Sequence, residues 1–367
     1  MKSSISDRSI HSKNWLSLKF HLIPVLLLFF HISVNAQDSI KTKKIKILPV
    51  PAFGYSPETK AYVGVVTMFT INMYHDSVTR TSNAKFEFNY TWNRQMILEG
   101  GWNYFFRQEK WFTTGRINYS NYPDMYYGIG PNTPETNKTS FDSRRFVFEV
   151  SALKKVGYKL FTGINLKYIE YYDVKSENNS LNYPELVDGS TFGIGYSFLK
   201  DTRNNLLTPT KGIYAYLNST YNFSAKNYTE FTLDLRYYKT WKDKFTLANR
   251  FINDFNMGSP PFFDFALLGG DKFVRGYYLG RYRDNNLSSF QSEFRFPAFW
   301  RIYLSAFGGL SNIYSTNNNF RLENSKYNYG FGIRFLVDKA ENTYLRLDYA
   351  IGQSNNDGFY ISFGESF

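Results

Sequence analysis

Long segments of this chain alternate apolar and polar residues, and this alternation restricts its fold more than any other feature. Residues 85–93 place Phe86, Phe88, Tyr90 and Trp92 at every second position, and residues 345–351 do the same with Leu345, Leu347, Tyr349 and Ile351. Successive side chains of a β-strand point to opposite faces of its sheet. The pattern therefore predicts a sheet with one apolar and one polar face.

The apolar face is rich in aromatic residues, which favours a sheet in lipid over a soluble sandwich. Phe, Tyr and Trp make up 20% of the chain, yet its mean hydropathy is only −0.41. Transmembrane barrels carry aromatic girdles and polar interiors. The one long apolar run, 22–34, is shorter than the roughly 20 residues of a spanning helix. We therefore predict an all-β barrel of the outer-membrane type.

We predict sixteen antiparallel transmembrane strands, and an even number suits a bacterial barrel. The expected strands are 46–55, 60–74, 82–94, 96–106, 110–121, 142–154, 157–172, 190–200, 212–224, 228–240, 244–255, 288–297, 301–314, 326–337, 342–352 and 357–367. The four longest connections, 122–141, 173–189, 256–287 and 315–325, all follow odd-numbered strands. Tight turns and both termini would then lie on the periplasmic side.

The amino terminus has the pattern of an export signal. Lys13 and Lys19 precede the apolar run 22–34, and small residues precede Gln37, so we expect a cleaved signal peptide over 1–36 and a location in a Gram-negative outer membrane. Residues 37–45 would form a short periplasmic lead-in and 46–367 the barrel. About ten residues cannot form a separate domain, which needs roughly 50 or more.

Composition argues against most enzyme classes. Cysteine is absent, and three of the four histidines lie in the predicted signal peptide, which leaves His75 in a polar turn where we expect it to be solvated. A zinc site or a Ser-His-Asp triad is therefore not expected. The formal charge is +12, but the only dense lysine block is 41–46. We expect no nucleic-acid binding, no metal, no cofactor and no enzymatic activity.

The longest loop, the sixth on its side of the barrel, carries a recognisable motif. It contains Gly269-Gly270-Asp271-Lys272-Phe273-Val274-Arg275-Gly276-Tyr277, and the next strand contains Ser292-Glu293-Phe294-Arg295-Phe296-Pro297. In this combination and placement the chain resembles the BamA/TamA family of bacterial surface antigens, outer-membrane barrels that insert or translocate proteins. Weaker matches at 54–59, 201–212 and 363–367 extend the resemblance over essentially all of 46–367. It implies a loop 6 that folds into the lumen.

In that family the loop arginine pairs with acidic residues on strands 12 and 13. Arg275, within Val274-Arg275-Gly276-Tyr277, matches the arginine, and Glu293 matches the strand-12 acid. The alternation independently points Glu293 into the lumen. Gly309 stands where the strand-13 acid is expected, so the resemblance implies a missing partner and a weaker lock. The soluble POTRA domains of the family are also not expected here. The alternative is that Arg275 is a solvated loop residue.

The first strand suggests a weak closing seam. Pro49 and Pro51 are two residues apart, so both missing N–H groups face the same neighbouring strand. If that neighbour is the last strand, with Phe363 and Phe367, the seam loses two donors worth about 0.5–1.5 kcal/mol each. Such a seam could open laterally into lipid. Two other interpretations stay open: the prolines precede the wall, or they face the second strand.

Three functions fit these observations. The first is a barrel that assists protein insertion or translocation, or lipid transport, through loop 6 and the seam, with outer-membrane lipid and client proteins as partners. The second is a passive channel for small solutes, which lumen residues of mixed charge would also suit. The third, and least supported, is a lipid hydrolase that relies on Ser–Lys chemistry.

Overall fold

The computed structural model describes residues 45–56, 60–74, 76, 78–92, 94–121, 123–176, 183–242, 244–338 and 343–367. The predicted signal peptide, nearly all of the lead-in, and His75 lie outside the described residues. Within the described ranges no helix is long and apolar enough to cross a membrane.

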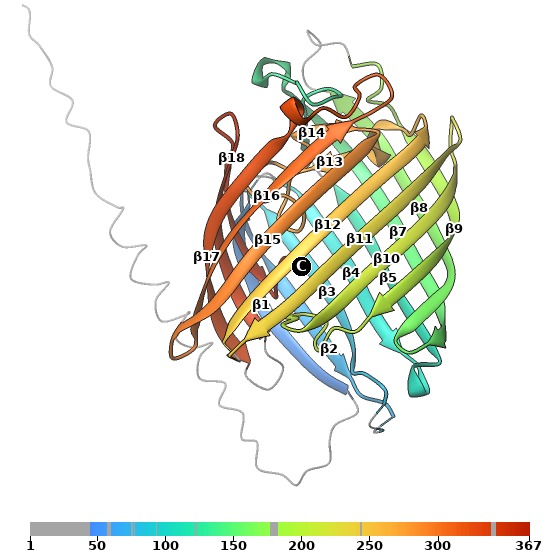
Figure 1. Cartoon of the computed structure of the whole chain (residues 1–367). Coiled ribbons are helices and arrows are strands. Elements are labelled where there is room, and N and C mark those ends of the chain that lie inside the picture. Colours follow the sequence, from blue (N-terminus) through green and yellow to red (C-terminus); the bar gives the residue numbers. More distant parts are fainter. Residues whose placement is uncertain are drawn as a thin grey trace, which may run out of the picture. The chain divides into compact units, whose positions relative to one another are not determined.

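Sixteen strands of the described chain form the wall of an antiparallel barrel (Figure 1). They are β1 (Ile45–Ser56), β2 (Lys60–Ile71), β3 (Ser82–Thr91), β4 (Met96–Phe105), β5 (Trp111–Asn121), β7 (Thr139–Gly157), β8 (Leu160–Ser176), β9 (Gly189–Asp201), β10 (Gly212–Phe223), β11 (Tyr228–Trp241), β12 (Phe245–Gly258), β15 (Asn286–Phe299), β16 (Ile302–Tyr314), β17 (Lys326–Asp338), β18 (Thr343–Gly352) and β19 (Asp357–Phe363). Each wall strand pairs with the next along the chain, which confirms the predicted sixteen-stranded architecture.

The two faces of the wall differ as the alternation predicts. On β17, Phe331 points outward and is 62% exposed, whereas Arg334 faces the lumen and is 1% exposed. Val63 on β2 is 65% exposed on the outer face, and Asp348 on β18 is fully buried inside. An apolar exterior and a polar, filled interior are the arrangement of a barrel solvated by lipid.

Several short elements lie outside the wall. They are β6 (Asp124–Tyr126), which pairs with β7; the hairpin of β13 (Ala266–Leu268) and β14 (Tyr282–Asp284) inside loop 6; and the 3₁₀ turns η1 (Arg107–Glu109), η2 (Glu135–Asn137), η3 (Phe262–Asp264) and η4 (Leu322–Asn324). Their three-residue lengths are too short to produce an alternating pattern, so they could not be predicted from the alternation. The hairpin lies near the long connections, at the top of Figure 1.

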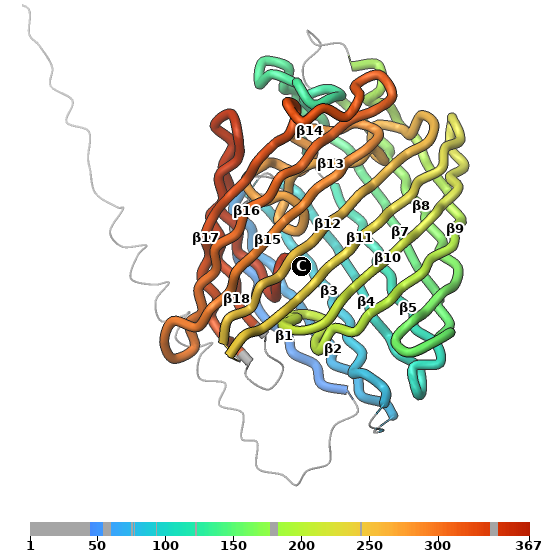
Figure 2. Tube along the Cα trace, in the orientation of Figure 1, coloured from blue at the N-terminus to red at the C-terminus, as the bar shows by residue number. Residues whose placement is uncertain are grey.

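The last strand is shorter than predicted. It ends at Phe363, and the chain leaves the ladder at Gly364, whose φ is 78°. Residues 364–367, which we call the carboxyl-terminal hook, turn into the barrel (Figure 2). There Phe367 packs with Tyr238 and Ala248, and Arg295 donates to its carbonyl oxygen at 3.1 Å. The prediction that Phe367 ends the alternating wall strand is therefore wrong, because its apolar ring finds buried partners in the lumen.

Candidate functional site in the barrel lumen

Loop 6 places Arg275 inside the barrel, beside the strand-12 acid named from the sequence. Nη2 of Arg275 lies 2.5 Å from Oε2 of Glu293 on β15, and both side chains are at most 2% exposed. The guanidinium also stacks on the ring of Phe307 on β16, 3.4 Å from its centroid. Arg275 is thus a buried, paired residue, and the alternative of a solvated loop arginine is wrong.

The expectation that Arg275 lacks a second acidic partner is also wrong. Its Nη1 pairs with Asp348, which stands on β18 instead of the neighbouring strand β16. At Gly309 on β16, a Cβ would meet Nε2 of Gln291 at 2.0 Å. Gln291 fills this space and forms two 3.1 Å hydrogen bonds with Asn328. The second carboxylate is therefore on β18, two wall strands from β16, and a neutral amide pair occupies the position where it was expected.

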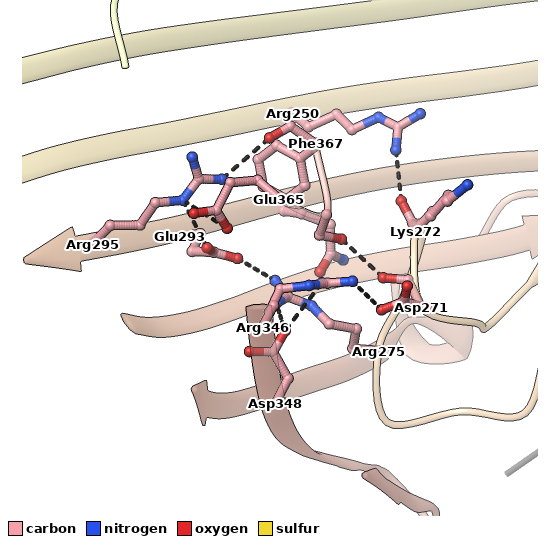
Figure 3. Close-up of polar contacts among 12 residues, drawn as sticks. Arg250, Asp271, Lys272, Arg275, Glu293, Arg295, Arg346, Asp348, Glu365 and Phe367 are labelled. Carbon is pink, nitrogen blue, oxygen red and sulfur yellow. Dashed lines mark hydrogen bonds and ion pairs between the residues drawn. The ribbon is translucent and has the colours of Figure 1, made fainter. Parts of the chain in front are cut away.

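Arg275 belongs to a larger set of charged side chains, which we call the lumen network. Its members are Asp271, Arg275, Glu293, Arg295, Arg334, Arg346, Asp348 and Glu365, most of which are labelled in Figure 3. Glu293 contacts three of the arginines, and Asp348 also contacts three. A buried charge is tolerated when it is paired and hydrogen-bonded. The network joins loop 6 to β15, β17, β18 and the carboxyl-terminal hook.

The rest of the Val274–Tyr277 motif fixes the tip of the loop. Gly276 has a φ of 99°, and a Cβ there would lie 2.9 Å from the carbonyl carbon of Ile351, so only glycine fits without strain. The Gly276 N–H donates to Oη of Tyr360 on β19 at 3.0 Å. Tyr277 donates its hydroxyl to the Tyr327 carbonyl at 2.6 Å, and Val274 is fully buried. Loop 6 is therefore attached directly to the last strand.

The seam between β1 and β19 is not closed by a regular ladder in the described residues. The two strands lie side by side, but neither the strand pairings nor the other backbone hydrogen bonds of the described chain join them. Pro49 and Pro51 lie within β1, opposite Thr67 and Val65 of β2, so they are part of the wall. Phe363 is the last residue of β19.

The direction of the prolines follows from the register of β1, β2 and β3. The carbonyl of Ala61 accepts from the N–H of Trp92, so odd-numbered residues of β2 face β3 and even-numbered ones face β1. The β1–β2 pairing has no register shift and matches even residues with even residues, as in Val50 with Val66. Pro49 and Pro51 therefore face away from β2 and towards β19. The interpretations that they precede the wall or face the second strand are wrong.

A side chain crosses this seam from the lumen. Tyr62 on β2 donates its hydroxyl to the carbonyl of Ile361 on β19, at 3.3 Å. A cavity of about 430 Å³ lies behind the seam, lined by residues of β1, β2, β19 and the hook, together with Lys272 of loop 6. The seam thus lacks backbone hydrogen bonds among the described residues and has a cavity behind it.

These features define a class: a lipid-facing antiparallel barrel of the outer-membrane type, with a long loop held inside the lumen by buried charges. Residues 67–367 match the model of the Omp85 superfamily domain, so the chain belongs to the Omp85 superfamily. No curated protein matches the sequence.

Solved structures with the same fold include two that differ greatly in sequence. The barrel resembles the crystal structure of BamA from Haemophilus ducreyi lacking POTRA domains 1-3, with 11% identity and a TM-score of 0.57 over 88% of this chain and 70% of that one. It also resembles CdiB from Acinetobacter baumannii, with 13% identity and a TM-score of 0.54 over 87% of this chain and 60% of that one. At these identities the likeness concerns the fold.

Proposed function

We propose that this barrel assists the insertion or translocation of client proteins, or the transfer of lipid, at the outer membrane by opening laterally between β1 and β19. The observation that carries the proposal is the seam, where two prolines present no donors to β19. An open strand edge is costly in hydrocarbon, because its unpaired groups find no water there. A seam with few hydrogen bonds to break lowers the cost of opening and offers an edge on which a client strand can pair.

Loop 6 supports the proposal because it connects the lumen network to the seam. Gly276 contacts Tyr360 on β19, and the hydroxyl of Ser366 in the hook donates to the carbonyl of Asp271 at 2.9 Å. A displacement of loop 6 would therefore also displace β19 and the hook. We infer that the loop sets the resting position of β19 and thereby controls how readily the seam opens.

A passive solute channel is less well supported. The cavity behind the seam and an outer cavity of about 1550 Å³ at the loop-bearing end both include residues of loop 6 in their walls, Lys272 in one and Tyr278 in the other. The loop thus stands between the two spaces, and buried ion pairs hold it there. In this proposal the barrel carries out no covalent chemistry, acts on lipid and client proteins, and reaches the membrane as an exported protein.

The experiment is to lock the seam by a disulfide. The natural chain has no cysteine, so introduced pairs give no background. Pro51→Cys is combined in turn with cysteines at 359, 361 and 363, and the pair that oxidises is reconstituted in lipid vesicles. The matched control is Ser289→Cys with Ser311→Cys, which locks β15 to β16, where the two hydroxyls lie 2.7 Å apart.

The readout is the folding rate of an added unfolded outer-membrane barrel precursor. We expect the unmodified protein to accelerate this folding, the seam lock to abolish the acceleration, reduction to restore it, and the control lock to leave it unchanged. Full acceleration by the locked seam would contradict lateral opening. No acceleration by the unmodified protein, together with a steady ion conductance, would favour the channel instead.

A further inference from the structure

The outer cavity contains a pair of buried cations that neither the seam nor the lumen network uses. Lys326, the first residue of β17, and Arg281 of loop 6 both line it, and they are 8% and 4% exposed. Both lie on the ring of Tyr282: Nζ of Lys326 is 4.6 Å from its centroid and Cζ of Arg281 is 4.5 Å away. Two positive charges therefore approach a single buried ring.

Neither cation is neutralised by a close carboxylate. Lys326 pairs with Ser311 through its backbone, but in the described part of the chain its Nζ has no hydrogen bond and no ion pair. Arg281 uses Nη1 and Nη2 on Thr133, at 3.1 and 2.9 Å, while its buried Nε has no hydrogen-bond partner. The nearest acid is Glu135, whose carboxylate is 3.7 Å from that Nε, is 65% exposed and is shared with Lys138. An exposed pair of this kind contributes little.

Buried charges that no close carboxylate neutralises are costly, so this arrangement calls for an anion. A carboxylate would balance one of the two charges, whereas a doubly charged phosphate balances both. Lysine provides a point charge and arginine a directed N–H donor, the combination that phosphate groups bind. The volume of about 1550 Å³ is larger than a free anion needs, and Tyr127 and Tyr278 contribute aromatic surface to the same wall.

We propose that Lys326 and Arg281 form a phosphate-binding site in the outer cavity, for free phosphate or for the phosphate group of a phosphorylated sugar that enters from the loop-bearing end. Neither Lys326 nor Arg281 belongs to β1 or β19, so this proposal does not depend on lateral opening. Loop 6 connects the site to the lumen network, because Arg281 follows the Val274–Tyr277 tip by four residues. The segment 123–138 is held to the loop by the Gly130 N–H, which donates to the Arg283 carbonyl at 2.7 Å.

The test is calorimetric titration of the full chain in detergent at constant ionic strength, with inorganic phosphate, glucose 6-phosphate and acetate as separate probes. Lys326→Met removes the buried charge, and Lys175→Met removes an exposed charge from the same cavity as the matched control. Retained heat-modifiable migration on gels shows that each variant is folded.

We expect phosphate or glucose 6-phosphate to bind more tightly than acetate. Lys326→Met should weaken binding at least about tenfold, a loss of ~1.4 kcal/mol, Lys326→Arg should restore most of it, and Lys175→Met should change it by no more than about twofold. If glucose 6-phosphate binds more tightly than inorganic phosphate, the ligand is the phosphate group of a phosphorylated sugar. If the two bind equally, the ligand is the free anion. No phosphate binding, or equal weakening by both methionine variants, would overturn the site.

A second measurement uses the unmodified protein, in case Lys326→Met does not fold. Phosphate at saturation should slow the acetylation of Lys326 by acetic anhydride, followed by mass spectrometry, and should leave the acetylation of Lys175 unchanged. Equal rates at Lys326 with and without phosphate would overturn the proposal.

Discussion

Arg275 in loop 6 and Asp348 on β18 form a buried ion pair in the lumen, although 73 positions separate them in the chain. The pair fixes loop 6 to the part of the wall that leads to the seam, because β18 is the pairing partner of β19. With Glu293 on the other side, the loop arginine is held from two strands that are not neighbours. The lock therefore joins the loop to two separate strands of the wall.

Removal of the loop arginine should destabilise the barrel strongly. Arg275→Ala leaves Glu293 and Asp348 with less compensation in a buried place, and breaking one partner of a buried pair costs about 3–5 kcal/mol. The measurement is the free energy of unfolding in guanidinium chloride in lipid vesicles. Arg321→Ala is the control: its pair with Glu323 is 66% and 70% exposed and should be worth at most about 1 kcal/mol. Equal effects of the two variants would contradict a buried lock.

A charged side chain should destabilise the barrel in the middle of the outer face of the wall and cost little in a loop. Phe331→Arg replaces a side chain that is 62% exposed on β17, and arginine on the lipid face of a barrel costs about 2–4 kcal/mol near the bilayer centre. Phe320→Arg replaces a phenylalanine that is 50% exposed in the 315–325 connection, where water is available, so less than about 1 kcal/mol is expected. The same unfolding measurement compares them. A small, equal cost at both positions would show that β17 is not in lipid.

The turn between β4 and β5 should give the barrel an acid-sensitive contact. Burial alone would raise the pKa of Glu109, but hydrogen bonds and charges from Lys159 and Arg80 outweigh burial and hold that pKa below its ordinary value of 4.5. Nζ of Lys159 lies 2.9 Å from the carboxylate and Nε of Arg80 lies 2.8 Å from it. The folded pKa is depressed, so this stabilisation is present above the unfolded value and is lost as the pH falls through the folded one.

Glu109→Gln should therefore lower the free energy of unfolding at neutral pH by at least about 1 kcal/mol. The variant should also lose less of its stability than the unmodified protein when the pH falls from neutral to acid. Unfolding midpoints measured from pH 7 down to about pH 3 test this. Glu323→Gln, which changes a carboxylate that is 70% exposed, should follow the unmodified protein. An unchanged acid profile for Glu109→Gln would show that its pairing does not stabilise the fold.

The wall could be predicted because every strand repeats the same physical requirement. Lipid on one side and water or polar groups on the other impose a period of two, and residues such as Phe86 and Glu87 show it without any knowledge of distant contacts. The ion pair of Arg275 with Glu293 followed from a family resemblance and from the inward direction of Glu293. Local pattern and one motif were enough for these features.

The features that were missed depend on the closed shape of the barrel. Asp348 alternates with apolar neighbours like many other lumen residues, and nothing local shows that it meets Arg275 across the interior. Phe367 continues the aromatic pattern of β19, and this pattern predicted a strand that runs to residue 367. The turn into the lumen at Gly364 could therefore not be predicted from the pattern. The buried position of Lys326 beside Arg281 likewise depends on where loop 6 lies.

The seam is tested most directly by hydrogen exchange of the backbone amides in β19, measured in lipid nanodiscs for the unmodified chain and for the double variant Pro49→Ala with Pro51→Ala. We expect the amides of 359–363 to exchange faster than those of β17, and the double variant, which restores two donors worth about 0.5–1.5 kcal/mol each, to slow them. Slow exchange in the unmodified chain, equal to that of β17 and unchanged by the two substitutions, would contradict a weak seam between β1 and β19.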